Sequence, residues 1–320
     1  MNNSFLNLAA IASVAMIGTM ASSEALPFLE EIVVSNDAKL HIEGVDVAAD
    51  GRIFVSSLLD SSVWVVSPDH QNITQFIEPG SLGMDSAVGL KVDERSGRLY
   101  VCSGPILGLS DFAAAAGPAG VLVFDLETGA PITRYDFPDS GFCNDVAFGP
   151  DGTLYATDSL HPRILRLPKN GDAMEVFIED AALGGEGFAL NGLGVHHNQL
   201  FFVKQNDGRM FSAEIQKDGT AGVLNEIELP RTLQSVDGVL MLDDGRALVV
   251  EGGRPGVTLF DPENAADTWQ EFEVDGLDVP ATAAFLPHGQ VVIANTQNDV
   301  LTDPTAETDP FTLTIFQLPN

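Results

Sequence analysis

Short apolar runs alternate with polar turns along this chain, and the alternation recurs at a regular interval. In residues 43–57, EGVDVAADGRIFVSS, one apolar run is followed by a tight turn and then by a second apolar run. Related segments begin at residues 88, 144, 191, 237 and 281. Apolar and β-branched runs bounded by Gly, Asp, Asn and Pro are typical of strands, and Asp-Gly pairs supply the positive φ that tight hairpins need. Each segment is therefore predicted to form a β-hairpin.

The hairpins form a repeat. The second residue of each segment lies 44 to 56 positions from the next, and these residues are Gly44, Gly89, Asp145, Gly192, Gly238 and Thr282. A period of roughly 40 to 50 residues with several strands each is typical of propeller blades. A third and a fourth strand are predicted after most hairpins, for example Arg163–Leu167 and Glu175–Ile178. The sequence therefore predicts an all-β protein, a six-bladed β-propeller with four-stranded antiparallel blades. The lack of helical periodicity between the strands argues against α/β folds.

The last repeat is one strand short. It contains only Thr282–Leu286, Gln290–Ala294 and Thr312–Gln317, whereas a spare strand, Leu29–Val34, precedes the first repeat. We expect this N-terminal strand to complete the last blade, because such closure ties the ring together and removes an open sheet edge. Residues 26–320 are accordingly predicted to form a single propeller domain.

The first residues have the pattern of a targeting segment. Residues 5–20, FLNLAAIASVAMIGTM, are continuously apolar and are followed by small residues. We interpret residues 1–25 as a signal peptide that is cleaved near Ala21 or Ala25, since the apolar stretch is short for a membrane anchor. The sequence thus predicts a secreted or periplasmic protein that has no membrane association after cleavage, and it does not indicate an oligomeric state.

The charge balance limits the classes of binding partner that we expect. The chain has 46 acidic and 15 basic residues, and its formal net charge is −31. Such a surface favours solubility and repels polyanions, so nucleic acids and anionic membranes are not expected partners. A small-molecule substrate is the expected partner.

Two cysteines, Cys102 and Cys143, are present. In the predicted propeller, Cys102 ends the second strand of blade two and Cys143 begins the first strand of blade three, on the same face of the molecule. An even number of cysteines in a secreted chain permits a disulfide between them. The alternative is two buried free thiols.

Four of the six repeats begin with an acidic or amide residue. These residues are Glu43, Asn144, Asn191 and Asp237, and the other two repeats have Val88 and Ala281 at this position. Blades arranged around an axis would bring the four side chains together at the centre. Carboxylate and amide oxygens suit a hard cation such as Ca²⁺, and the absence of Cys and His from the set argues against zinc. Asn-Gly and Asp-Gly pairs also serve as simple turn residues, but the shared repeat position favours a cation site.

The ordered set Glu, Asn, Asn, Asp, together with the stretch NDVAFGPDGTLYATDS that begins at Asn144, resembles the senescence marker protein/gluconolactonase (regucalcin-like) family. More distantly, it is similar to diisopropylfluorophosphatase and the paraoxonases. The resemblance extends from about Leu29 to the end of the chain. It implies a six-bladed propeller with a divalent metal ion, expected to be calcium, in the central tunnel. The implied ligands are Glu43, Asn144, Asn191 and Asp237, and the resemblance implies that Asp237 is also the catalytic base or nucleophile.

The resemblance also implies an activity. We expect a metal-dependent hydrolase of a lactone or related ester, in which the cation polarises the carbonyl group and Asp237 activates water or attacks directly. The alternative is a non-catalytic binding propeller in which the ion is structural. A propeller of the strictosidine synthase type, which relies on a glutamate base without metal, does not account for the four-residue set.

Polar residues of the predicted rim are candidate substrate contacts. Loops between the second and third strands lie on the same face as the starts of the first strands, and those loops contain His161, Gln205, Glu251 and Asn295. An insertion at Ser103–Ala119 accounts for the longest step between repeats. We interpret it either as a lid over the tunnel mouth or as an ordinary surface loop.

Overall fold

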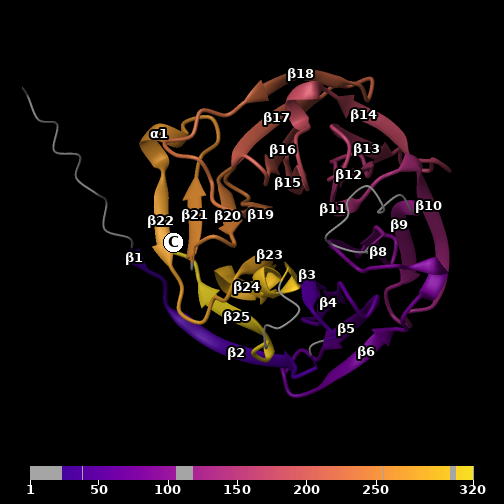
Figure 1. Cartoon of the computed structure of the whole chain (residues 1–320), viewed down its shortest axis with the longest axis vertical. Coiled ribbons are helices and arrows are strands. Elements are labelled where there is room, and N and C mark those ends of the chain that lie inside the picture. The colour runs from indigo at the N-terminus through magenta and orange to yellow at the C-terminus, as the bar shows by residue number, and fades with distance from the viewer. Residues whose placement is uncertain (1–23, 38, 106–117, 255, 303–307, 320) are drawn as a thin grey trace, which may run out of the picture.

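Six β-sheets surround a central axis in the computed structural model (Figure 1). The structure describes residues 24–37, 39–105, 118–254, 256–302 and 308–319. Each sheet is a blade whose first strand lies nearest the axis, and the following strands run outward to the rim. The predicted six-bladed propeller with four-stranded antiparallel blades is therefore confirmed.

The strands of the first three blades follow one another in chain order. Blade one contains β3 (Ile42–Val47), β4 (Ile53–Ser57), β5 (Ser62–Val66) and β6 (Ile73–Ile77). Blade two contains β7 (Leu90–Asp93), β8 (Arg98–Ser103), β9 (Pro118–Asp125) and β10 (Pro131–Ser140). Blade three contains β11 (Cys143–Phe148), β12 (Leu154–Asp158), β13 (Arg163–Leu167) and β14 (Glu175–Glu179).

The remaining blades repeat this order except at the closure. Blade four contains β15 (Leu190–His196), β16 (Gln199–Lys204), β17 (Arg209–Ile215) and β18 (Ala221–Glu226). Blade five contains β19 (Val236–Met241), β20 (Ala247–Glu251), β21 (Gly256–Phe260) and β22 (Gln270–Glu273). Blade six contains β23 (Pro280–Leu286), β24 (Gln290–Asn295), β25 (Phe311–Gln317) and the N-terminal strand β2 (Phe28–Ser35).

Helices have a minor place in this part of the chain. One turn of α-helix, α1 (Ala265–Thr268), precedes β22, and the longest described helix is the 3₁₀ segment η4 (Asn298–Thr302) after β24. None of the described helices could therefore span a membrane.

The ring is closed by the start of the chain. Strand β2 pairs antiparallel with β25, with Ile32 opposite Leu313, so the predicted closure of the last blade is confirmed. A two-residue strand that the sequence did not predict, β1 (Glu24–Ala25), pairs in parallel with β22 of blade five. Only these two residues of the predicted leader are described, and the rest of it lies outside the described residues. The start of the described chain thus joins blade five to blade six.

The apolar core is divided among the blade interfaces. Because each blade is packed between two others, both faces of its middle strands are buried, and adjacent residues of one strand enter different cores. In β4, Ile53 and Val55 pack between blades six and one, whereas Phe54 packs between blades one and two. This arrangement explains why the middle strands are apolar at nearly every position.

Neighbouring inner strands approach each other closely around the axis. A side chain at Gly192 would collide with the backbone carbonyl oxygen of Asp237 in the next blade, so glycine is required there for steric reasons. Blade six has a threonine at the equivalent position. Thr282 Oγ donates a hydrogen bond to the Glu43 carbonyl oxygen at 2.7 Å and accepts one from the Val45 N–H at 2.9 Å. Neighbouring inner strands are therefore joined either by close contact at a glycine or by a polar bridge.

A disulfide links blades two and three. Cys102 in β8 is bonded to Cys143 at the start of β11, and their Cα atoms are 5.1 Å apart. Both residues are fully buried. The bond closes a loop of 41 residues, for which the loop-entropy estimate gives a stabilisation of about 4 kcal/mol. The disulfide thus fixes the second strand of blade two covalently to the first strand of blade three.

We predict that closure by β2 is needed for stability. Ile32 is 5% exposed and packs in the core between blades six and one, whereas its neighbour Val33 is 46% exposed. Substitution Ile32→Ala is expected to lower the free energy of unfolding by about 2–5 kcal/mol because it leaves a cavity in this core. The matched substitution Val33→Ala is expected to change it by less than about 1 kcal/mol. Denaturant titration of both variants measures the difference, and equal effects would contradict the role of β2.

Candidate functional site

The four residues at the start of the repeats occupy equivalent places in the structure. Each is the second residue of an inner strand: Glu43 in β3, Asn144 in β11, Asn191 in β15 and Asp237 in β19. In each of these blades the pairing with the second strand is interrupted just after the first residue, so the four residues lie in irregular parts of the ladder. Such bulges redirect side chains and are common next to functional sites. The irregular ladder is what allows these side chains to point to the axis.

All four side chains line one cavity of about 270 Å³. They are between 3% and 7% exposed, so the cavity floor consists of buried polar side chains. The other lining residues are two amides, Gln205 and Asn298, and the apolar residues Leu58, Val88, Phe142, Phe188 and Leu301. The site is therefore a small polar floor within apolar walls.

Three oxygens on this floor have no hydrogen-bond partner among the described residues. They are Glu43 Oε2, Asn191 Oδ1 and Asp237 Oδ1, and they come from three different blades. A buried oxygen without a partner is destabilising, and three such atoms in one cavity require a common explanation. Two carboxylates and an amide carbonyl are hard oxygen donors, which are the ligands that calcium and magnesium prefer. The residues present thus fit a hard divalent cation.

The electrostatics of the two carboxylates agree with this fit. Burial, followed by repulsion from Asp237 and Asp145, raises the pKa of Glu43 well above its usual value. Burial and the nearby Asp145 also raise the pKa of Asp237 to about 7, although a hydrogen bond from the Asn191 side chain acts in the opposite direction. Two buried acids that disfavour each other's negative charge are what a cation between them would stabilise. Among the described residues no group of three His, Cys, Asp or Glu side chains is placed so that it could hold a metal ion, so any cation here depends on the amide ligands.

Gln205, a predicted substrate contact, lines the cavity and is hydrogen-bonded to a candidate cation ligand, Asn191. Its Oε1 accepts a hydrogen bond from Asn191 Nδ2 at 3.3 Å. This contact occupies the nitrogen of the Asn191 amide and leaves its Oδ1 facing the cavity. Gln205 is therefore a positioning residue for a candidate cation ligand, because partners of this kind orient metal ligands.

Glu251 and Asn295, the other predicted substrate contacts on β20 and β24, do not line the cavity. Glu251 is 1% exposed and accepts hydrogen bonds from the Arg231 guanidinium, the Thr258 hydroxyl and the Gln234 N–H. Asn295 donates to the Gly276 carbonyl oxygen and to two threonine hydroxyls, and it accepts a hydrogen bond from the Asp278 N–H. Both side chains hold neighbouring loops in place.

These two residues are part of a second polar repeat. The last residue of every second strand is polar and at most 3% exposed, and these residues are Ser57, Ser103, Asp158, Lys204, Glu251 and Asn295. They stand where the chain leaves the second strand for the loop that leads to the third. The residues of this ring anchor the rim loops.

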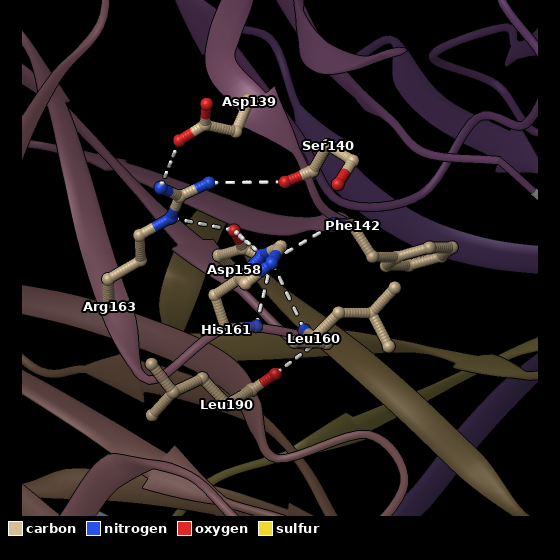
Figure 2. Close-up of polar contacts among 9 residues, drawn as sticks. Asp139, Ser140, Phe142, Asp158, Leu160, His161, Arg163 and Leu190 are labelled. Atoms are coloured by element: carbon tan, nitrogen blue, oxygen red, sulfur yellow. Dashed lines mark hydrogen bonds and ion pairs between the residues drawn. The ribbon is translucent and has the colours of Figure 1, made fainter. Parts of the chain in front are cut away.

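Asp158 is the most connected member of this ring (Figure 2). Its fully buried carboxylate accepts hydrogen bonds from the backbone N–H groups of Phe142 and Leu160 at 3.0 and 3.1 Å. It also accepts hydrogen bonds from Arg163 Nε and His161 Nδ1, both at 3.0 Å. Arg163 continues the network to Asp139 and to the Ser140 carbonyl oxygen, as Figure 2 shows. One carboxylate therefore holds the loop between β12 and β13 and fixes it to the residue that precedes β11.

This network reaches the cavity through Phe142. The Phe142 ring lies edge-on to Phe188 with ring centroids 4.8 Å apart, and both rings line the cavity. His161, a predicted substrate contact, is held by Asp158 but does not line the cavity. Its imidazole side chain is 39% exposed.

Some residues of the site have no counterpart in the sequence pattern. Asn298 and Leu301 enter the cavity from η4, in the loop between β24 and β25. His41, which is 1% exposed, contacts Asn298 through an Nε2–Oδ1 distance of 2.9 Å. No repeat position marks these residues, and only a fold would reveal them. Most of the predicted lid, Ser103–Ala119, lies outside the described residues.

Comparison with known proteins gives a clear result for the fold. No protein-family model matches the sequence, and no curated protein matches it. Solved structures match nearly the whole chain. A calcium-binding protein, regucalcin, from Agrobacterium tumefaciens has a TM-score of 0.66 and 13% identity, and the match covers 93% of this chain and 98% of that chain. A gluconolactonase from Xanthomonas campestris has a TM-score of 0.64 and 14% identity, with coverage of 92% and 96%.

The same architecture also occurs with other chemistry. Virginiamycin B lyase from Staphylococcus aureus has a TM-score of 0.59 and 14% identity, and the match covers 91% of this chain and 99% of that chain. The resemblance to regucalcin and gluconolactonase structures is thus confirmed for the fold. At these identities the likeness establishes architecture, and the activity has to be argued from the cavity.

We predict that Asp158 supports the rim loop through its charge. Substitution Asp158→Asn keeps the shape but removes the negative charge beside Arg163, whose side chain is only 8% exposed. The free energy of unfolding is expected to fall by about 3–5 kcal/mol, because the buried guanidinium loses its buried carboxylate partner and keeps only the exposed Asp139. The control His161→Ala removes one exposed donor and is expected to lower it by less than about 1 kcal/mol. Denaturant titration tests both variants, and a small effect of Asp158→Asn would contradict the assignment.

Proposed function

We propose that this protein is a divalent-cation-dependent hydrolase of a lactone or related carboxylic ester, and that its cation is calcium. The proposed ligands are Glu43, Asn144, Asn191 and Asp237. The proposal rests on the three buried oxygens without partners that meet on the floor of one cavity. Its choice of cation and reaction is supported by the likeness of the fold to a calcium-binding regucalcin and to a gluconolactonase.

The ligand set has a charge suited to this role. Glu43 and Asp237 provide two negative charges, and the two asparagines provide neutral carbonyl oxygens. A bound divalent cation would supply Lewis-acid stabilisation of the negative charge that develops on a substrate carbonyl oxygen. Four protein ligands are fewer than the six to eight oxygens that calcium takes, so this set leaves room for water and substrate.

Asp237 is the proposed general base. Its Oδ1 is buried on the cavity floor and has no hydrogen-bond partner among the described residues. In the proposed reaction Asp237 takes a proton from a water molecule, and the water oxygen forms a bond to the carbonyl carbon. The ester C–O bond then breaks, and the departing oxygen takes the proton back from Asp237. The base is thus restored, and one water has been added to the substrate.

The walls of the cavity narrow the substrate class. Leu58, Val88, Phe142, Phe188 and Leu301 surround the polar floor. Apart from the four proposed ligands, the only polar lining side chains in the described chain are those of Gln205 and Asn298. A sugar lactone with many hydroxyl groups would find few partners here, whereas a lactone or ester with an apolar body would bury its surface. We therefore infer that the substrate is an apolar lactone or ester that is small enough for a cavity of about 270 Å³.

The cation is tested by binding. Purified wild-type protein is expected to contain one ion per chain, and calcium at about 1,000 times the dissociation constant should stabilise it by about 4 kcal/mol. This stabilisation is measured as a rise in melting temperature on addition of calcium. Substitution Asn191→Ala removes one proposed ligand oxygen and should abolish most of that rise. The control Asn225→Ala, at an exposed position in β18, should behave like wild type. If calcium does not shift the wild-type melting temperature, the cation site is wrong.

The reaction is tested with a panel of apolar lactones, aryl esters and sugar lactones. Wild type is expected to hydrolyse an apolar member of the panel, and chelation should abolish that activity. Substitution Asp237→Asn should lower kcat by about 10²–10⁴-fold through loss of the base, with the fold retained. Hydrolysis that persists after exhaustive chelation would contradict the mechanism. Binding of calcium without hydrolysis of any substrate would favour the alternative, a binding propeller with a structural ion.

A further inference from the structure

A second, larger cavity lies between blades two and three. This groove has a volume of about 840 Å³ and is lined by the turns β7–β8, β11–β12 and β13–β14. Those turns follow the C-terminal ends of the inner strands β7 and β11, whereas the four proposed cation ligands lie at the N-terminal ends of inner strands. The groove is therefore on the opposite face of the propeller and shares no lining residue with the candidate active site.

The groove gathers basic residues in a protein that has few of them. Lys91, Arg95, Arg98 and Lys169 all line it, although the whole chain has only 15 Lys and Arg residues against 46 Asp and Glu. Lys91 is paired with Asp46 at 3.0 Å. Arg95, Arg98 and Lys169 form no ion pair with any residue that the structure describes.

This lack of pairing is unusual within the molecule. Across the described ranges, the only other basic residues without an ion pair are Lys39 and Lys217, which are exposed and lie in other parts of the chain. With three times as many acids as bases, pairing would be the expected outcome for every cation. The unpaired cations are instead concentrated in one groove.

The acidic residues of the groove do not neutralise these cations. Asp93 accepts hydrogen bonds from the Arg95 backbone N–H at 3.1 Å and the Ser96 hydroxyl at 2.6 Å, and thus closes its own turn. Glu94 accepts a hydrogen bond from the Ala49 N–H of blade one at 2.6 Å. Neither carboxylate forms an ion pair with a described guanidinium group, although Asp93 lies opposite Arg98 in the β7–β8 pair. The basic residues that line the groove outnumber these two acidic residues, so the lining keeps an excess of positive charge.

Aromatic side chains form the wall beside the cations. Tyr100, Tyr135 and Phe148 line the groove, and the rings of Tyr100 and Phe148 meet edge to face with centroids 5.1 Å apart. Tyr135 and Phe148 are partly exposed, so their rings are available for contact. Ligand sites combine such apolar surfaces with a few charged groups that fix orientation.

We propose that this groove binds a small organic anion in which a phosphate group is attached to a flat or apolar body. Three unpaired cations match a doubly charged group, and guanidinium groups bind phosphate through paired, charge-assisted hydrogen bonds. The aromatic wall accommodates the body of the ligand. The acidic surface elsewhere does not prevent binding, because at physiological ionic strength charges are screened beyond about 8 Å. This site is separate from the proposed hydrolase site and needs no divalent cation.

The test is calorimetric titration of the full-length, metal-free protein at physiological salt. Phenyl phosphate is the probe, and inorganic phosphate, benzoate and phenol are the comparison ligands. Wild type is expected to bind one phenyl phosphate per chain, more tightly than each comparison ligand. The double variant Arg95→Ala/Lys169→Ala changes exposed turn residues and should weaken binding at least about tenfold through loss of charge-assisted contacts.

The control matches the change in charge. The double variant Lys39→Ala/Lys217→Ala removes the two unpaired bases outside the groove and should bind like wild type. Equal weakening in both double variants would show a general charge effect and overturn the proposal, as would the absence of saturable binding by wild type. Binding of benzoate or inorganic phosphate as tight as that of phenyl phosphate would overturn the proposed ligand class. Unchanged binding by Asp237→Asn is expected, so the groove and the hydrolase site are tested separately.

Discussion

The close approach of the inner strands around the axis is the constraint on which the rest of the molecule depends. A side chain at Gly192 or Gly44 would collide with the backbone of the next blade, so the ring closes only with glycine or with a side chain that bridges the blades. Thr282 is such a bridge between blades six and one. Because the strands are fixed at this level, the residue just before each contact has to face the axis. The shared position of the four proposed ligands is thus a geometric consequence of the way in which the ring is packed.

Two polar rings with different tasks lie at the same end of the blades, one on the first strands and one on the second strands. The ring at the start of the first strands has oxygens without partners and carboxylates whose pKa values are raised, and such features are typical of functional sites. The ring at the end of the second strands has its hydrogen bonds satisfied, as Asp158 and Asn295 show. The satisfied ring holds the loops from which the walls of the cavity are built. Loop anchoring and the candidate site are therefore assigned to neighbouring strands of the same repeat.

The sequence predicts the parts of this structure that repeat. The blades, the closing strand β2 and the shared position of the four axial residues follow from apolar periodicity and from the register of the turns. Glu251 and Asn295 show what the sequence cannot predict. A polar residue near a rim loop has the same sequence pattern whether it contacts a ligand or anchors the loop. Asn298 enters the cavity from a segment outside the repeat. The groove joins turns that are far apart in the chain, since Arg95 and Lys169 are separated by 74 positions, so no local sequence pattern predicts it.

The closure by β2 also sets an order of events. Ile32 pairs with Leu313, so the first strand of the propeller to be synthesised finds its partner only when the last strand has been made. Until then β2 has two open edges, and blade six is incomplete. Contacts of such long sequence separation form late and slowly, and an unpaired strand is prone to pair wrongly. Glu30 and Glu31 interrupt the apolar run of this strand. Their charges then oppose aggregation of β2 while β25 has not yet been made.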